Sequence, residues 1–137
     1  IRATGLRPRR ICYYACSGWK WGVYMRALEM ARRGSVVFDD LLKEVTAYPE
    51  VRVEAGRAED FVRKIVGDVN RMPEDDVDRR LAVGAIDELR VIREAADFLG
   101  REFDSDVYVY SEDDPERYDP RGRAGLAEPY RPAIYIE

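Results

Sequence analysis

Arginine and tyrosine side chains gather in a long polar segment near the end of the sequence. Four arginines and two tyrosines lie in or beside residues 118–132: Arg117, Arg121, Arg123, Arg131, Tyr118 and Tyr130. A guanidinium group offers a fork of donors to phosphate, and a tyrosine ring stacks on a base, so the pattern suits single-stranded or looped RNA. The alternative is a surface loop held down by its prolines. Because the segment is longer than a hairpin requires, which is typical of functional loops, it is the first candidate site.

The acidic clusters do not predict catalysis or metal binding. Three clusters are present: Asp39–Asp40; Asp75, Asp76 and Asp78; and Glu112, Asp113 and Asp114. None has the spacing of a calcium loop with its central glycine and distal glutamate, and a pair that opens a helix is explained by the helix dipole. The chain has no histidine, so neither Ser17 nor Ser111 has the usual base to activate it.

The two cysteines predict reduced thiols in the core. Cys12 and Cys16 lie in one apolar run, and in a strand they would be roughly 13 Å apart, which is too far for a disulfide. A zinc site would need two more strong ligands. We therefore expect no metal site and no cofactor in this chain.

Charge is distributed unevenly. The 137 residues carry a net charge of −4, which is unusual for a nucleic-acid-binding protein, yet residues 1–33 hold eight basic residues against Glu29 alone. The basic residues are mostly arginine, which suits RNA contact. The alternative is a source organism whose proteins are rich in Arg, Asp and Glu throughout.

The motif Trp19-Lys20-Trp21 has two interpretations. The tryptophans could form a platform on which bases stack. Because residues two apart on a helix point to different sides, they could instead be two anchors in the core.

Apolar periodicity predicts an α+β fold with a small sheet of about three strands packed against about four helices. The expected strands are residues 11–16, 107–110 and 133–137, an N-terminal strand and a C-terminal pair. The expected helices are residues 19–33, 36–47, 58–72 and 87–103, the last with Asp87 as its N-cap. Residues 51–55 are ambiguous between strand and loop, and residues 77–85 between a short helix and a connector.

Both ends of the sequence carry an expectation. The first residue is Ile1 rather than Met, so we expect a piece of a longer chain, with residues 1–10 as a linker and residues 11–137 as one domain. The last residues continue an apolar alternation without a tail, so we expect the chain end to be fixed in a strand.

Three blocks resemble the C-terminal domain of archaeal and eukaryotic-type leucyl-tRNA synthetases. The first is the strand–helix opening over residues 11–24, with Gly18-Trp19-Lys20-Trp21. The second is residues 86–103 leading into residues 107–110. The third joins residues 118–124 to residues 131–137. Together the blocks cover about half of the chain, and residues 34–85 fit only loosely.

The resemblance implies a tRNA-binding appendage without a catalytic site. The parent would be a class I leucine–tRNA ligase in the cytoplasm, with its ATP and Mg²⁺ bound in upstream domains of the same chain, and with no membrane contact. The family's domain reaches the long variable arm of leucine tRNA with its very end. Carried over, this implies contacts by Ile134, Ile136 and Glu137, and backbone contacts by three arginines, Arg121, Arg123 and Arg131.

Two other functions stay open from the sequence. One is a protein–protein docking module that adds its last strand to a partner's sheet and does not bind RNA. The other is a small metal-dependent enzyme built on the acidic clusters.

Overall fold

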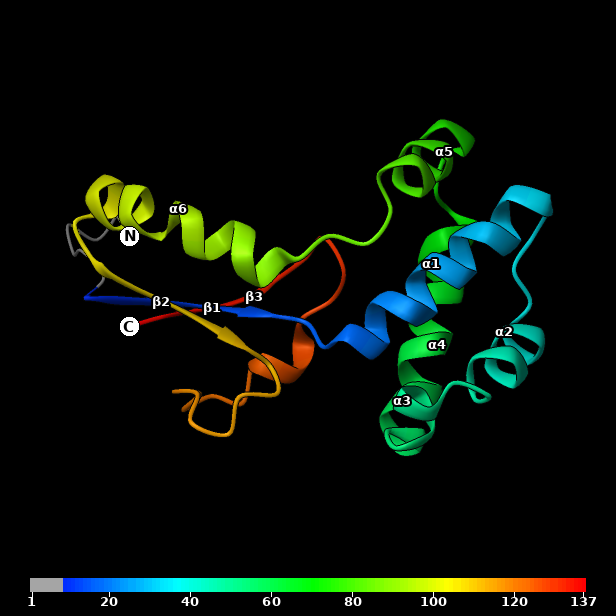
Figure 1. Ribbon diagram of the computed structural model, residues 1–137, viewed down its shortest axis with the longest axis horizontal. Coiled ribbons are helices and arrows are strands. Elements are labelled where there is room, and N and C mark those ends of the chain that lie inside the picture. Colours follow the sequence, from blue (N-terminus) through cyan, green and yellow to red (C-terminus); the bar gives the residue numbers. More distant parts are fainter. Residues whose placement is uncertain (1–8) are drawn as a thin grey trace. The chain divides into compact units, whose positions relative to one another are not determined.

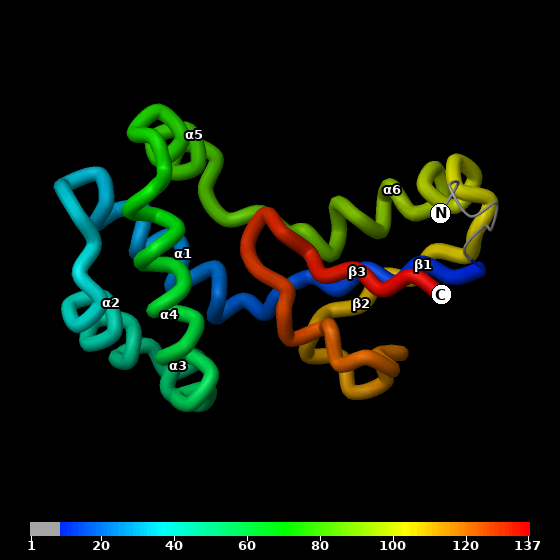
Figure 2. The backbone as a smooth tube through the Cα atoms, turned by 180° about the vertical axis from the view of Figure 1, so that it is seen from behind, coloured from blue at the N-terminus to red at the C-terminus, as the bar shows by residue number. Residues whose placement is uncertain are grey.

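The computed structural model describes residues 9–137, and these residues form two compact units. One unit joins residues 9–17 to residues 87–137 and contains the sheet. The other, residues 18–86, is helical. Figure 1 labels the elements, and Figure 2 follows the chain from the first strand, β1 (Arg10–Ala15), through the helices to α6 (Glu88–Phe103) and β2 (Asp106–Ser111). The helical unit is therefore an insertion between the first strand and the rest of the sheet unit.

Within residues 9–137 the sheet has three strands, the number that the sequence predicted, and the N-terminal strand lies between the other two. The central strand β1 (Arg10–Ala15) pairs in parallel with β2 (Asp106–Ser111) and antiparallel with β3 (Ala133–Ile136). Parallel neighbours require a crossover connection, which here contains the whole helical unit and α6. Because β1 is central, it is buried on both faces at Ile11 and Cys12, which explains its continuous apolar sequence.

Helix α6 (Glu88–Phe103) covers one face of the sheet, where it contacts β2 and β1. The Asp87 carboxylate accepts a hydrogen bond from the Arg90 amide at 3.2 Å, so Asp87 is the predicted N-cap. Asp104 ends the helix with φ 50°, in the left-handed region. Gly100 allows the chain to turn back closely, since an added Cβ would lie 3.0 Å from the Ser105 carbonyl oxygen.

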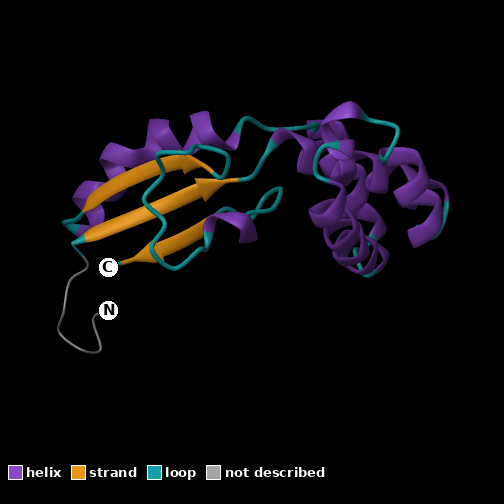
Figure 3. Cartoon of the chain, turned by 90° about the horizontal axis from the view of Figure 1, so that it is seen from below, coloured by secondary structure: helices purple, strands orange, loops and turns teal. Residues whose placement is uncertain are grey.

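The opposite face of the sheet carries the segment between β2 and β3. Figure 3 shows this segment crossing the three strands on the side away from α6. It contains the short helix η2 (Ala124–Leu126). We call this side of the sheet the open face, because no long helix of the sheet unit covers it. The loop arginines are therefore presented above a rigid sheet.

The helical unit is built around α1 (Gly18–Arg33), which contacts α2 (Phe38–Val45), α3 (Pro49–Arg52), α4 (Ala55–Asn70) and α5 (Glu74–Val83). Trp19 and Trp21 are both buried. Trp19 packs edge-on against Phe61 with the ring centroids 5.3 Å apart. The two tryptophans therefore anchor α1 in the core, which is the second of the two interpretations of this motif, and they do not form a platform for bases.

Most predicted boundaries lie within a few residues of the observed ones. The part of the chain that the structure describes has six α-helices, where the sequence predicted about four. Residues 51–55 are neither strand nor extended loop: α3 runs to Arg52 and α4 begins at Ala55. Pro49 begins α3, since its fixed φ suits the first turn of a helix. Residues 77–85 lie largely in α5. The expected linker, residues 1–10, lies outside the described residues except for Arg9 and Arg10, and Arg10 already belongs to β1.

Candidate nucleic-acid interface

The segment between β2 and β3 is tied to the open face at its start. The Tyr14 hydroxyl, on β1, donates a hydrogen bond to the Tyr118 carbonyl. The Asp119 carboxylate accepts from the amides of Arg123 at 2.7 Å and Ala124 at 3.2 Å, which closes a turn around Arg121. Ala124 is completely buried. The loop is thus ordered, and the turn that carries Arg121 has a defined position.

The end of the same segment is also fixed. The Tyr130 amide donates to the Glu88 carboxylate at the start of α6 at 3.2 Å. Burial raises the pKa of Glu88 above its ordinary value, and the hydrogen bond from the Tyr130 amide lowers this pKa in part. Residues Glu128 and Arg131 form an isolated antiparallel bridge just before β3. The chain therefore enters β3 in one register.

Glu137 is the centre of a hydrogen-bonded junction beside β3. Its amide donates to the Arg10 carbonyl at 2.9 Å, which extends the pairing of β3 with β1. Its carboxylate accepts from the hydroxyls of Tyr118 at 2.7 Å and Tyr135 at 3.2 Å, and Arg10 lies 3.4 Å away. The hydrogen bond from Tyr118 is the main cause that holds the pKa of Glu137 below its ordinary value, with Tyr135 and Arg10 acting in the same direction. Glu137 is therefore an ionised acceptor at neutral pH.

Aromatic rings and guanidinium groups form a continuous row across the open face, which we call the aromatic row. In spatial order its members are Arg123, Tyr135, Tyr118, Arg10, Tyr108, Tyr110 and Tyr14. Neighbouring centres in the row lie between 4.4 and 6.4 Å apart, the usual range for stacked rings and cations. Such a surface offers both stacking faces and positive charge, as recognition of single-stranded nucleic acid requires.

The predicted arginines differ in how they are held. Arg121 is exposed, and its side chain has no hydrogen bond or ion pair with the residues that the structure describes. Arg123 donates to the Ile134 carbonyl at 3.2 Å and lies 5.8 Å from the Tyr135 ring. Arg131 is exposed and lies 3.9 Å from the Glu128 carboxylate. Arg121 is therefore the best placed to bind phosphate, whereas Arg123 also holds the loop to β3.

Ile134 and Ile136 point away from the aromatic row. They pair with Tyr13 and Ile11 of β1, so their side chains lie on the α6 side of the sheet, beyond the part that α6 covers. Their exposed fractions are 41% and 46%. The predicted site residues thus divide over the two faces of β3, with Glu137 and Arg123 on the open face and the isoleucines on the other.

The sequence did not single out Arg10, Tyr108 or Tyr135 as site residues. The alternation of residues 106–111 placed Tyr108 and Tyr110 on one face of a strand, which was the available signal. Arg10 and Tyr14 of the row lie about a hundred positions before these tyrosines, and Tyr118, Arg123 and Tyr135 come from the loop and strand that follow, so the proximity of the three segments was not visible in the sequence.

The acidic residues have structural partners. The Glu112 carboxylate is buried and accepts from the Ser17 amide at 2.7 Å, and Asp113 accepts from the Ser17 hydroxyl at 2.8 Å. Asp39 and Asp40 lie in the first turn of α2, and Asp75 and Asp76 in that of α5, where carboxylates are favoured. Asp78 lies 3.9 Å from the Arg32 guanidinium. Across residues 9–137, no three His, Cys, Asp or Glu side chains come close enough to hold a metal ion. In the same range no helix has the length and apolarity needed to cross a membrane.

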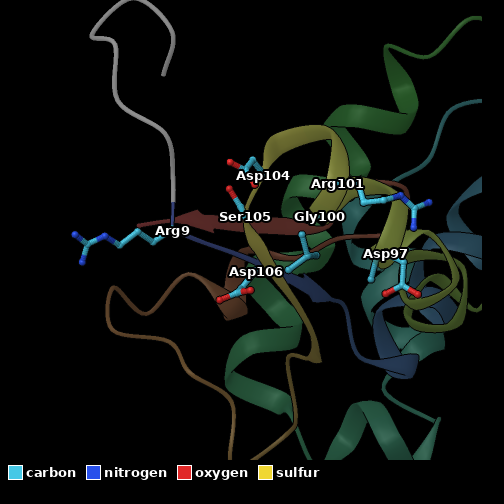
Figure 4. Close-up of a pocket in the computed structure, with 9 residues that line it drawn as sticks. Arg9, Asp97, Gly100, Arg101, Asp104, Ser105 and Asp106 are labelled. Atoms are coloured by element: carbon cyan, nitrogen blue, oxygen red, sulfur yellow. The ribbon is translucent and has the colours of Figure 1, made fainter.

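A pocket of about 740 Å³ lies where α6 meets the beginnings of β1 and β2. Its lining includes Arg9, Asp97, Arg101, Asp104 and Asp106. Figure 4 shows the side chains of Arg9 and Arg101 extending away from each other rather than into a common space. The pocket does not collect convergent polar groups, so the aromatic row and the Arg121 turn remain the better candidate site.

The sequence of the chain was compared with those of known proteins. No protein-family model matches the chain. All 137 residues align with leucine–tRNA ligases of three archaea: Methanothrix thermoacetophila at 37% identity, Methanococcoides burtonii at 34% and Methanosarcina acetivorans at 32%. The chain spans 14% of the length of each of these ligases. Over its whole length the chain is therefore a homologue of one segment of the archaeal leucine–tRNA ligases, as its resemblance to them predicted.

Proposed function

We propose that this chain is the C-terminal tRNA-binding domain of a leucine–tRNA ligase and that it contacts the long variable arm of leucine tRNA. The observation that carries the proposal is the alignment of the whole chain with a small part of much longer ligases. The catalytic centre, with its ATP and Mg²⁺, would belong to upstream domains of the same cytoplasmic protein. This chain would contribute affinity for the tRNA.

The surface chemistry supports a small and local contact. The chain is acidic overall, at −4, and a broad phosphate surface would be repelled. Its exposed arginines near β3, Arg121, Arg123 and Arg131, instead lie in one ordered loop. These arginines would hold the RNA backbone, while Ile134, Ile136 and Glu137 would lie against bases at the tip of the arm.

The loop arginines give the first test. Arg121→Ala in the full-length ligase is expected to weaken tRNA binding and to lower the magnitude of the logarithmic salt slope by about 0.7–0.9, the loss of one phosphate contact. The free energy of unfolding should stay within about 0.5 kcal/mol of the parent protein, because the side chain is exposed. Arg123→Ala should also weaken binding and flatten the slope, with an added loss of stability because Arg123 holds Ile134. Filter binding over a series of salt concentrations measures both slopes.

Arg93→Ala is the matched control for this test. Arg93 is exposed on α6, so its replacement removes the same charge from the other side of the sheet. Its slope should equal that of the parent protein. Equal slopes for the parent and both loop variants would contradict the assignment of Arg121 and Arg123 to the RNA backbone.

The exposed isoleucines give the second test. Ile136→Ala is expected to weaken tRNA binding by about fivefold or more, the result of losing about 1 kcal/mol of apolar contact. Stability should change little, since about half of the side chain is already exposed. Val91→Ala is the control, because Val91 is comparably exposed on α6 at 54%. If Ile136→Ala binds tRNA as tightly as Val91→Ala does, the isoleucine does not touch the RNA.

The exposed β3 strand supports one competing function. β3 is an edge strand with two exposed isoleucines, which is the kind of surface to which a partner strand can add. A docking module of this kind would not change the electrophoretic mobility of leucine tRNA at any salt concentration. A salt-dependent shift favours the tRNA-binding function.

A further inference from the structure

The outer edge of β3 carries backbone groups that do not face β1. The two strands pair antiparallel, and Arg10 and Glu137 exchange two backbone hydrogen bonds, of 3.3 and 2.9 Å. In an antiparallel pair, residues bonded to the partner strand alternate with residues whose backbone groups point away from it. The N–H and C=O groups of Ile136 and Ile134 therefore point to the outer edge of the sheet.

The Arg123 side chain lies across this edge. Its guanidinium donates to the Ile134 carbonyl at 3.2 Å, and the guanidinium carbon lies 5.8 Å from the centre of the Tyr135 ring. Tyr135 belongs to the open face, so the Arg123 side chain passes from that face to the backbone at the edge. A cationic side chain thus occupies one of the outward acceptors of β3.

The turn before η2 fixes the backbone of Arg123. The Asp119 carboxylate accepts from the amides of Arg123 and Ala124. This carboxylate is only 9% exposed and lies 3.5 Å from the Arg117 guanidinium, and Ala124 is completely buried. Because the backbone is held on both sides of the Arg123 side chain, the contact with Ile134 belongs to the folded loop.

The β3 edge is complementary to a second copy of itself. Two β3 strands related by a two-fold axis at Tyr135 would pair antiparallel, with Ile134 of each copy opposite Ile136 of the other. The outward backbone groups of both residues would then be hydrogen-bonded. The isoleucines, 41% and 46% exposed, would pack against each other across the axis. A two-fold interface requires such self-complementarity.

The other edge strand, β2, differs from β3 in its apolar side chains. Val107 and Val109 are partly buried, and they lie on the side of the sheet where α6 contacts β2. Addition of a strand at β2 would find these valines already covered, whereas addition at β3 would cover two exposed isoleucines. An edge strand with exposed apolar side chains is the one that requires protection from pairing.

We propose that Arg123 closes the β3 edge and so prevents this chain from pairing through β3 with a second copy of itself. In the symmetric pair, the Ile134 carbonyl of each copy would accept from the Ile136 amide of the other. Arg123 occupies this carbonyl, so it competes with two of the four backbone hydrogen bonds of the pair. The role requires no RNA and is therefore independent of the proposed tRNA binding.

Sedimentation equilibrium of the full-length ligase at a series of protein concentrations tests this role. The apparent mass of Arg123→Ala is expected to rise with concentration toward twice that of the parent protein. Arg123→Met keeps an apolar stem beside the Tyr135 ring and removes only the donors, so it should associate in the same way. This variant decides the question if Arg123→Ala is not folded. Thermal unfolding followed by circular dichroism checks the fold of each variant.

Arg121→Ala is the matched control. It removes the same charge from the same turn, and the Arg121 side chain forms no hydrogen bond or ion pair with the residues that the structure describes. Its apparent mass should equal that of the parent protein at every concentration. Ile134→Lys combined with Arg123→Met should restore the parent mass as well, because a lysine on an edge strand opposes pairing with another strand.

Hydrogen exchange locates the contact. In Arg123→Met, a peptide that contains residues 133–137 should exchange more slowly at high than at low protein concentration, because pairing would protect the outward amides. The same peptide of the parent protein should exchange at one rate. A folded Arg123→Met protein that keeps the parent mass overturns the proposal, and so does equal association of Arg121→Ala. Neither result involves tRNA, so each leaves the proposed function as it stands.

Discussion

Leucine tRNA with a shortened variable arm is expected to bind equally well to the full-length ligase and to a ligase from which this chain has been removed. With the natural tRNA, removal of the chain should weaken binding on the order of 100-fold, since a few contacts of about 1 kcal/mol each would be lost. The physical reason is that the candidate contacts lie in one loop and one strand end, so they can reach a single protruding part of the RNA. Binding of both tRNAs to both proteins gives a complete double-mutant cycle.

The control for this cycle is a tRNA with an equal number of nucleotides removed from another loop. With this control tRNA, removal of the chain should weaken binding as much as it does with the natural tRNA. If the loss from the shortened arm and the loss from the deleted chain add together, the domain contacts another part of the tRNA, and the assignment to the variable arm is wrong.

Tyr14→Ala is expected to lower the free energy of unfolding by about 3–5 kcal/mol, the range for removal of a buried aromatic ring. Tyr14 is fully buried on the central strand, where its ring supports Tyr110 and its hydroxyl holds the Tyr118 carbonyl. The replacement therefore removes the base of the aromatic row and the anchor of the loop together. Urea denaturation followed by circular dichroism measures the change, and tRNA binding should be lost in parallel.

Tyr14→Phe separates the two roles of this residue. It keeps the ring and loses only the hydrogen bond to Tyr118, so we expect a cost of about 1 kcal/mol. Both tryptophans lie in α1, so tryptophan fluorescence reports directly on the helical unit and circular dichroism on both units. A Tyr14→Ala protein as stable as the parent would contradict the role of the aromatic row in holding the sheet unit together.

Local patterns allowed much of the fold to be predicted. Helix α6 was visible because its cap and its apolar spacing are both local: Asp87 bonds the Arg90 amide, and the half-buried face follows a helical repeat. The strand β1 was visible as a short continuous apolar run, and β2 and β3 were visible from their apolar alternation. Residues 51–55 were not assigned correctly, because a four-residue helix such as α3 is too short to show a period, and Val53, 84% exposed, resembles a strand residue only by type.

The candidate site shows where local patterns stop. The sequence placed arginines and tyrosines in the loop before β3. It also showed that the whole chain resembles part of the leucine–tRNA ligases. It could not indicate that Arg123 binds the Ile134 carbonyl while Arg121 stays exposed. That difference depends on which strand the loop crosses, and no spacing along the chain records it.

The sequence by itself determined the elements, the uneven charge and the family to which the chain is similar, because these follow from neighbouring residue types and from their order. Only the tertiary structure decided that Arg10, Tyr108 and Glu137 are neighbours. Arg10 and Tyr108 lie on β1 and β2, and Glu137 directly follows β3. The pairing of these strands joins segments about a hundred residues apart, such as Cys12 with Tyr108 and with Tyr135. A register of this kind is set by the buried faces of the whole sheet, and a shift of one residue would turn every side chain of a strand to the other face.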